Sequence, residues 1–260
     1  MIGGRTRVSL PEGWQLIVYD TVNSTSAEAK RLANITTNSN NTVLVIRADV
    51  QTDGHGRDSK TWYSPAGNLH FSVLFLKPKI QPSQFVLASL LASVAVVEGI
   101  AETAPALRHK LSCKWPNDVL CNRRKLCGIL PEGAYKDGRL VWLVIGIGIN
   151  VAHAPDAAIV QYPTTSLALE GVQSSIQVLM SAVCHQIALW LLRWQMEGFS
   201  PVRSRWLARA SDIGSTVTAQ LDPHHNIISG IFLGLDHDGA LLLERAGGIK
   251  QRVLTGEIFY

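Results

Sequence analysis

The sequence predicts an α+β protein, in which helices pack on a mixed or antiparallel sheet and a small β-barrel follows. Before residue 211, short runs rich in β-branched residues are separated by longer segments of helix-forming composition. After residue 214, short alternating strands are separated only by turns, which is typical of a small closed barrel. We therefore expect two domains, at residues 1–211 and 212–260.

The first elements are expected to alternate between strand and helix. Thr25 is predicted to open a helix, and Glu28 three residues later would complete a capping box with it. The residues from Ala27 to Ala33 that follow are good helix formers. The other expected elements of this part are strands over 14–20, 43–50 and 69–76, and a polar loop over 36–42.

Two long helices and a set of hairpins are expected to follow. The first helix, over residues 82–103, has an apolar part shorter than the roughly 20 residues that a bilayer requires, so we expect a core helix and no membrane. The second is predicted to be capped by Ser174 or Ser175 and to end at Gly198. The remaining elements are strands over 111–115, 119–121, 125–132 and 140–149, and a short helix over 201–210.

Composition narrows the class of protein. The chain has 260 residues, of which 47% are hydrophobic and 17% charged, as expected for a globular protein with a large core. Its net charge of +4 suits an anionic substrate such as a nucleotide, or an acidic partner, and does not by itself imply DNA. Its four cysteines form no CxxC pair, and no signal peptide precedes them, so we expect reduced thiols in the cytoplasm.

The most informative segment is residues 114–118, Lys-Trp-Pro-Asn-Asp, followed at 125–130 by Lys-Leu-Cys-Gly-Ile-Leu. Proline fixes its own φ and lacks a backbone donor, so this segment is neither a helix interior nor a central strand. It is interpreted as a hairpin-like hinge that holds Asn117, Asp118 and Lys125 close together. The alternative is a solvated turn that carries a surface tryptophan.

A second charged segment follows the strand expected at 43–50. Gly54 and Gly56 allow close approach of the backbone to a ligand, Arg57 and Lys60 supply positive charge, and Trp62 offers a flat face. Alone, this pattern equally fits a mobile solvated loop. It fails as a dinucleotide fingerprint because no third glycine and no helix follow, and no Walker loop is present. The Gly-x-Gly at 146–148 fails for the same reason.

Together these segments closely resemble the signature motifs of biotin–protein ligases, a likeness that extends over most of the chain. The loop at 51–62 resembles the family's Gln-x-x-Gly-Arg-Gly-Arg-x-Gly-Arg-x-Trp, with His55, Ser59 and Lys60 as departures. Ser24 and Thr25 match the family's ureido-binding Ser-Thr-Asn, in which Ser26 replaces the asparagine. The resemblance implies a class II synthetase-like catalytic domain and an SH3-like C-terminal barrel.

The resemblance also implies residue roles. Arg57, Lys125 and Asp118 are expected to act in catalysis. The biotin-binding residues implied are Ser24, Thr25, Ser26, Gln51, Gly54, His55, Gly56, Arg57, Lys125 and Gly128. The ATP-binding residues implied are Arg57, Lys60, Trp62, Asn117, Lys125 and Asn150. No metal ion is expected to be fixed by the protein alone, and magnesium would accompany the phosphates.

The reaction implied has two steps. The biotin carboxylate attacks the α-phosphate of ATP to give biotinyl-5′-AMP and pyrophosphate. A lysine of a biotin carboxyl carrier protein, as in acetyl-CoA carboxylase, then attacks the adenylate and releases AMP. The motifs begin near residue 24, so we expect the form without an N-terminal helix-turn-helix and without nucleic-acid binding. A homodimer is compatible with the resemblance.

Three alternatives stay open at this stage. A lipoate ligase or octanoyl transferase shares the fold, but its Arg-Arg-x-Ser-Gly-Gly-Gly loop is absent from this sequence. A biotin-sensing repressor would bind DNA. A catalytically silent biotin-binding module would keep the pocket and lack the chemistry.

Overall fold

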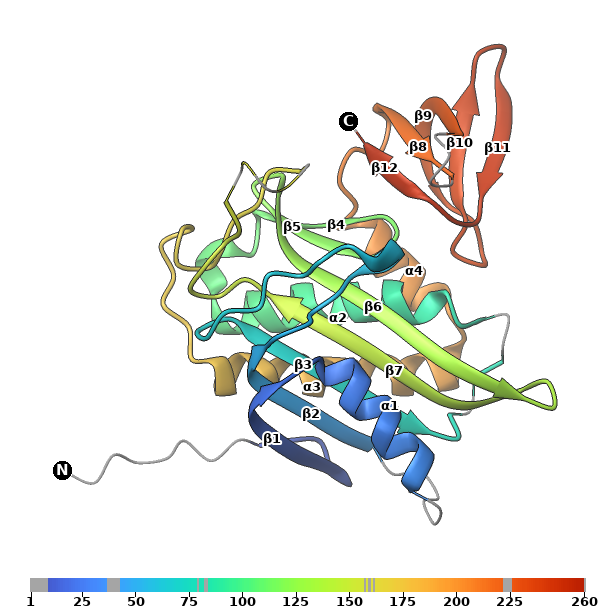
Figure 1. Ribbon diagram of the computed structural model, residues 1–260. Helices are drawn as coiled ribbons and strands as arrows, with labels where there is room; N and C mark the ends of the chain where they lie inside the picture. Colours follow the sequence, from blue (N-terminus) through green and yellow to red (C-terminus); the bar gives the residue numbers. More distant parts are fainter. Residues whose placement is uncertain are drawn as a thin grey trace.

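The protein forms two sheets, one in each part of the chain (Figure 1). The computed structural model describes residues 9–36, 43–78, 80–81, 84–156, 158, 160, 162–221 and 226–259. The predicted polar loop at 36–42 and the predicted start of the first long helix at 82–83 fall largely outside these residues.

The larger sheet has seven strands in the order β1-β2-β3-β7-β6-β5-β4. The strands are β1 (Trp14–Val22), β2 (Val43–Gln51), β3 (Leu69–Leu76), β4 (Leu111–Lys114), β5 (Asp118–Cys121), β6 (Arg124–Lys136) and β7 (Arg139–Ile149). Strands β1 and β2 pair in parallel, and every other neighbouring pair is antiparallel. This confirms the mixed sheet, and the strand ranges differ from the predicted ones by a few residues at their ends.

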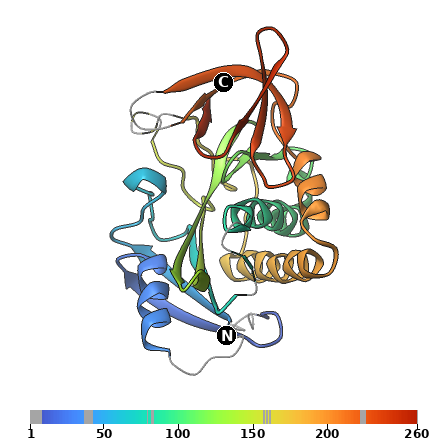
Figure 2. The same ribbon diagram turned by 90° about the vertical axis from the view of Figure 1, so that its right-hand side faces the viewer.

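Helices cover both faces of this sheet (Figure 2). They are α1 (Thr25–Ile35), α2 (Leu87–Thr103), α3 (Ile176–Glu197) and α4 (Ser200–Leu207), with short 3₁₀ turns at η1 (Arg57–Ser59) and η3 (Pro105–Leu107). One face packs on α2 and α3, which lie side by side, and the other packs on α1. Helix α2 is buried along nearly its whole length because the sheet, α3 and α4 all pack on it.

The two long helices approach each other closely. A Cβ on Gly99 of α2 would lie 2.8 Å from Cγ2 of Val183 on α3, so the glycine makes this contact possible. By length and composition alone, α3 qualifies as a membrane-spanning helix. Its buried side chains, among them Trp190 and Trp194, nevertheless belong to the same core as α2, so here it is a helix of the protein interior.

The predicted capping box at α1 is wrong by one residue. Ser24, not Thr25, is the N-cap, and its Oγ accepts from the backbone N–H of Ala27 at 3.5 Å. Glu28 therefore falls one position beyond the box, where its carboxylate accepts from the Tyr19 hydroxyl and from Arg31. As the first helical residue, Thr25 points its side chain at the neighbouring strands instead.

The C-terminal part is a five-stranded antiparallel sheet in the order β11-β10-β9-β8-β12. Its strands are β8 (Thr216–Gln220), β9 (Ile227–Leu235), β10 (Leu241–Arg245), β11 (Ile249–Val253) and β12 (Glu257–Phe259). Strands β11 and β12 form its edges, so within the described residues the expected barrel is not closed by strand pairing. This sheet lies against the end of the larger one that carries β4 and β5 (Figure 1).

The turn between β9 and β10 joins the two sheets. Trp115 is 1% exposed, and its Nε1–H donates to the carbonyl of Gly239 at 3.2 Å. The alternative of a surface tryptophan is therefore wrong. Gly239 has a φ of +81°, and a Cβ there would lie 2.7 Å from Leu87 and 2.9 Å from Leu90, so the turn packs directly on α2.

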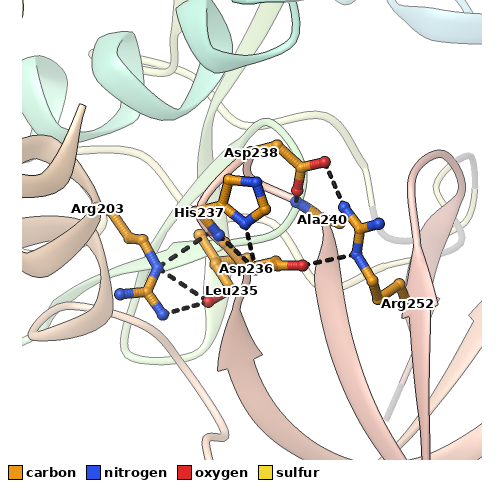
Figure 3. Close-up of polar contacts among 7 residues, drawn as sticks. All are labelled: Arg203, Leu235, Asp236, His237, Asp238, Ala240 and Arg252. Atoms are coloured by element: carbon orange, nitrogen blue, oxygen red, sulfur yellow. Dashed lines mark hydrogen bonds and ion pairs between the residues drawn. The ribbon is translucent and has the colours of Figure 1, made fainter. Parts of the chain in front are cut away.

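Two arginines hold the same turn in place (Figure 3). Arg203 on α4 donates to the carbonyls of Leu235 and Asp236, at 2.9 and 3.1 Å. Arg252 on β11 binds the carboxylates of Asp236 and Asp238. Asp236, His237 and Asp238 are spaced like metal ligands, but both carboxylates are already ion-paired with Arg252.

Candidate active site

A cavity of about 600 Å³ opens on the α1 side of the large sheet. Its floor comes from β6 and β7, and its walls come from the start of α1, the loop after β2, β12 and the side chains of Pro155, Val160, Tyr162 and Thr164. The sequence-predicted residues that line it are Ser24, Thr25, Ser26, Gln51, His55, Gly56, Arg57, Lys60, Trp62, Asn117, Asp118, Lys125, Gly128 and Asn150. Segments more than 200 residues apart in sequence thus meet around one space.

Gly54 is the one predicted residue that does not line this cavity. It is buried within its own loop, where a Cβ would lie 2.5 Å from the Ser64 hydroxyl and 2.8 Å from the Trp62 carbonyl. Glycine is required here because the loop folds onto itself. Direct contact between Gly54 and a ligand stays a prediction.

The floor of the cavity is flat because it is built from glycine. Gly128 on β6 and Gly148 on β7 lie beneath the indole of Trp62, and a Cβ on Gly148 would come within 2.3 Å of Nε1 of that indole. The Nε1 atom is buried and has no hydrogen-bond partner among the described residues. The indole of Trp62 therefore packs directly on the glycine surface, and its contact with a ligand ring stays a prediction.

One end of the cavity is a cluster of hydroxyl groups. The Oγ of Ser72, on β3, lies 2.8 Å from Oγ1 of Thr25 and 3.0 Å from Oγ of Ser26. A Cβ on Gly146 would lie 2.6 Å from the Ser26 hydroxyl, so this glycine leaves space beside the cluster. The cluster sits at the N-terminus of α1, where the helix dipole favours a partly negative ligand atom.

Gln51 connects the hydroxyl cluster to the loop. Its Oε1 accepts from the backbone N–H of Thr25 at 2.8 Å and from the hydroxyl of Thr25 at 3.1 Å. Its Nε2 donates to the Ser64 hydroxyl at 2.9 Å, and that hydroxyl donates to the Trp62 carbonyl at 3.0 Å. The glutamine is therefore held at both ends of its amide.

The hairpin motif places charge at the other end. Nζ of Lys125 lies 2.8 Å from Oδ1 of Asp118, as predicted from their spacing. Burial alone would lower the pKa of Lys125, but the charge and hydrogen bond of Asp118 outweigh it, so the pKa is raised. Lys125 is therefore a permanent cation facing the cavity.

The two predicted asparagines bind backbone carbonyl groups near the Lys125–Asp118 pair. Asn117 donates to the Ile129 carbonyl at 2.7 Å, and Asn150 donates to the Thr165 carbonyl at 3.0 Å. Asn150 is 2% exposed. Both amides therefore shape the wall, and each still lines the cavity.

The cationic loop is tied to the C-terminal sheet. Arg57 donates to the Gly256 carbonyl at 2.7 Å, and Nζ of Lys60 lies 2.6 Å from Oε2 of Glu257. Burial would raise the pKa of Glu257, but its hydrogen bond to Lys60 and the nearby lysine charges outweigh burial and lower it. The C-terminal part thus supplies one wall of the cavity, a role that the sequence did not assign to individual residues.

Several site residues were missed in the sequence. Ser72 and Ser64 have no local signal, because a serine in a strand or loop is common. Glu257, Phe259 and Tyr162 reach the cavity only through long-range contacts. Gly146 and Gly148 did carry a signal, since glycine inside a strand often marks close approach of another group.

Lys114 is also part of this end of the fold. It is 1% exposed, and its Nζ lies 4.2 Å from the centre of the Tyr162 ring. Burial lowers the pKa of Lys114, and the negative charges of Asp118 and Glu257, which raise it, only partly offset this effect. The lysine of the motif therefore lies behind the cavity wall, over the ring of a residue that lines it.

Comparisons with known proteins agree with this architecture. Residues 18–150 match the biotin/lipoate A/B protein ligase family, and residues 212–260 match the biotin protein ligase C-terminal domain. The bifunctional ligase/repressor BirA of Bacillus subtilis is 35% identical over 242 residues, which cover 92% of this chain and 72% of that protein. The biotin–[acetyl-CoA-carboxylase] ligase of Paracoccus denitrificans is 34% identical, covering 91% and 97%.

A solved structure shares the whole arrangement. The biotin protein ligase of Aquifex aeolicus, in complex with biotin and ATP, superposes with a TM-score of 0.75 at 26% identity, covering 94% of this chain and 97% of that one. Two family models, relatives above 30% identity and this structural match coincide on one family. The chain therefore belongs to the biotin/lipoate A/B protein ligase family, among the biotin protein ligases.

Proposed function

We propose that this chain is a biotin–[acetyl-CoA-carboxylase] ligase. It forms biotinyl-5′-AMP from biotin and ATP and transfers biotin to a lysine of a biotin carboxyl carrier protein. The observation that carries the proposal is that one cavity joins a hydroxyl cluster, an aromatic face and Lys125 paired with Asp118. The names of the Paracoccus denitrificans and Mycobacterium tuberculosis relatives support the same activity.

The geometry suggests how the substrates lie. The ureido ring of biotin is proposed to lie at the hydroxyl cluster, with the rest of its bicyclic body beside the Trp62 indole that packs on the glycine floor, and its carboxylate then points toward Lys125. Lys125 and Arg57 face the place where the carboxylate and the α-phosphate must meet. Fixed cations there offset the repulsion of two anions, and aligning the reactants contributes on the order of 7–11 kcal/mol in favourable cases.

The two steps ask different things of the chain. Adenylate formation needs cationic side chains, and Lys125 supplies one because its raised pKa keeps it charged. Transfer needs the adenylate kept from water until a carrier lysine arrives. The contacts of Arg57 and Lys60 with the C-terminal sheet hold the loop across the cavity for this purpose. Asp118, which is ion-paired with Lys125, is proposed to orient that lysine.

Magnesium is proposed to enter with the nucleotide. The two carboxylates that line the cavity, Asp118 and Glu257, are each held by a lysine, so neither is free to serve as a dedicated metal ligand. Phosphate oxygens would hold the ion, whose chemistry is to neutralise charge on the phosphates.

The setting of the enzyme is also a proposal. We place it in the cytoplasm because its four cysteines are free, and without nucleic acid because its net charge of +4 includes no block of like charges. A homodimer paired through the edge at β1 would be detected by sedimentation velocity, whereas the edge at β4 already bonds to the backbone of Arg209 and Ser211. The domain boundary at 211 and 212 is supported by the second family model, which begins at residue 212.

The decisive experiment is transfer of labelled biotin to a purified biotin carboxyl carrier domain, with ATP omitted as control. Labelled lipoate is tested in parallel, because a lipoate ligase would transfer lipoate and not biotin. Binding of biotin by calorimetry without ATP–pyrophosphate exchange would instead indicate a silent binding module. Label on the carrier only with biotin and ATP together would establish the proposed activity.

A further inference from the structure

The hydrogen bonds of the hydroxyl cluster run in one direction, which Gln51 sets and Ser72 passes on to Ser26. Oε1 of Gln51 must face Thr25, because the backbone N–H of Thr25 needs an acceptor there. The Thr25 hydroxyl has a single proton, and the acceptor Oε1 of Gln51 takes it. Thr25 can then only accept from Ser72, so the Ser72 hydroxyl is the donor in that contact.

The same reasoning extends one residue further. Ser72 has spent its proton on Thr25, so its contact with Ser26 requires Ser26 to donate. Ser26 lines the cavity with an oxygen whose proton is already committed to Ser72. What it offers to a ligand is therefore a lone pair. At the opposite end, Ser64 accepts from Gln51 and donates to the Trp62 carbonyl, which prevents the Gln51 amide from turning over.

We propose that Ser72, which does not line the cavity, is a positioning residue that makes Ser26 an obligatory hydrogen-bond acceptor for an N–H group of the cyclic urea of biotin. This rests on the proposed function. Ser72 is 0% exposed and lies beneath both hydroxyls, so it acts only through them. The chain thereby distinguishes an N–H from an oxygen at this position of a ligand ring, since two acceptors repel each other.

The test compares biotin with its two cyclic carbamate analogues, in each of which one ureido N–H is replaced by a ring oxygen. Calorimetric titration without nucleotide gives the dissociation constants. The unaltered protein should bind one of the two analogues about 100-fold more weakly than biotin, because its ring oxygen meets the Ser26 lone pair. Ser72→Ala frees the Ser26 proton, and the penalty should fall below about tenfold.

The control is Ser93→Ala, which removes an equally buried serine whose hydroxyl bonds to the Ser89 carbonyl of its own helix. It should leave the penalty unchanged. General loosening by Ser72→Ala would weaken biotin and analogue by the same factor and leave their ratio intact, which would overturn the inference.

Failure of the inference and failure of the proposed function give different results. If the unaltered protein neither binds biotin nor supports biotin-dependent ATP–pyrophosphate exchange, both fall. If the unaltered protein binds biotin and supports the exchange, but Ser72→Ala keeps the full loss of affinity for the carbamate analogue, only the role assigned to Ser72 is wrong.

Discussion

Nζ of Lys125 and Oδ1 of Asp118 lie 2.8 Å apart at the wall of the cavity, and the carboxylate keeps the lysine charged. In Asp118→Asn that support is lost while burial remains, so the pKa of Lys125 should fall. We expect the alkaline limb of the pH profile for ATP–pyrophosphate exchange to move to lower pH. Asp20→Asn, which changes an exposed carboxylate on β1, is the control and should leave the profile in place.

The charges that meet the two anionic substrates should be required for the first step. Lys125→Ala and Arg57→Ala are each expected to lower adenylate formation strongly, by at least about 100-fold, and to leave the fold intact. Biotin-dependent exchange measures the rate, and circular dichroism checks the fold. Near-normal exchange in both variants would remove the assignment of these residues.

The ion pair of Lys60 and Glu257 should matter for retention of the adenylate more than for stability. Its side chains are 53% and 32% exposed, so Glu257→Gln should cost at most about 1 kcal/mol of unfolding free energy. The loop loses a contact with β12, so release or hydrolysis of the adenylate should rise several-fold in the absence of carrier. Glu197→Gln, which removes a comparable exposed pair with Arg193 on α3, provides the matched control.

The glycines of the floor should separate binding of biotin from folding. A Cβ on Gly146 would press on the Ser26 hydroxyl, and one on Gly148 would collide with the rigid indole of Trp62. Gly146→Ala should therefore weaken biotin binding by moving a flexible side chain, and Gly148→Ala should do so more severely by displacing the ring. Calorimetry with biotin measures both, and equal affinities in all three proteins would contradict the described floor.

The junction between the sheets should be sensitive at Gly239. Alanine there combines a φ of +81° with contacts of 2.7 and 2.9 Å to Leu87 and Leu90, so Gly239→Ala should cost about 2–4 kcal/mol. Gly138→Ala isolates the backbone component, because its φ is +70° and nothing lies within 4 Å of its Cβ position. It should cost about 1 kcal/mol in urea unfolding. Equal losses in the two variants would refute close packing of the turn on α2.

Acid should weaken the fold partly through His70. Burial lowers the pKa of His70 below its usual 6.5, against its hydrogen bond to the Pro65 carbonyl. The unfolded chain therefore takes up a proton before the folded one does, so stability from this group is lost as pH falls below about 6.5. His70→Gln should flatten the dependence of unfolding free energy on pH in that window. The exposed His185→Gln is the control.

Local patterns sufficed for most of the elements and for the cluster around Lys125. The runs at 43–50 and 69–76 are strands, and the spacing of Asp118 and Lys125 does bring them together. These features depend on residues close in sequence, where periodicity and turn chemistry decide the outcome.

Features that depend on distant contacts escaped prediction. The burial of Trp115 against the C-terminal sheet was not predicted, because nothing near it in sequence indicates that Gly239 accepts its N–H. Ser72 looked like any strand residue until β3 was placed beneath α1. The N-cap of α1 is Ser24 and not Thr25, because the Thr25 hydroxyl bonds to Gln51 and Ser72 on neighbouring strands and not to its own helix.

The bonds from Arg57 and Lys60 to Gly256 and Glu257 have a consequence for engineering. In a chimera that joins a relative's C-terminal domain to this catalytic domain, the residues facing Arg57 and Lys60 would differ and these contacts would be lost. Such hybrids should work only when the segment 51–62 is transplanted together with the C-terminal domain. In natural relatives, a substitution in the loop at 51–62 is likewise expected to be accompanied by a substitution in the facing C-terminal segment.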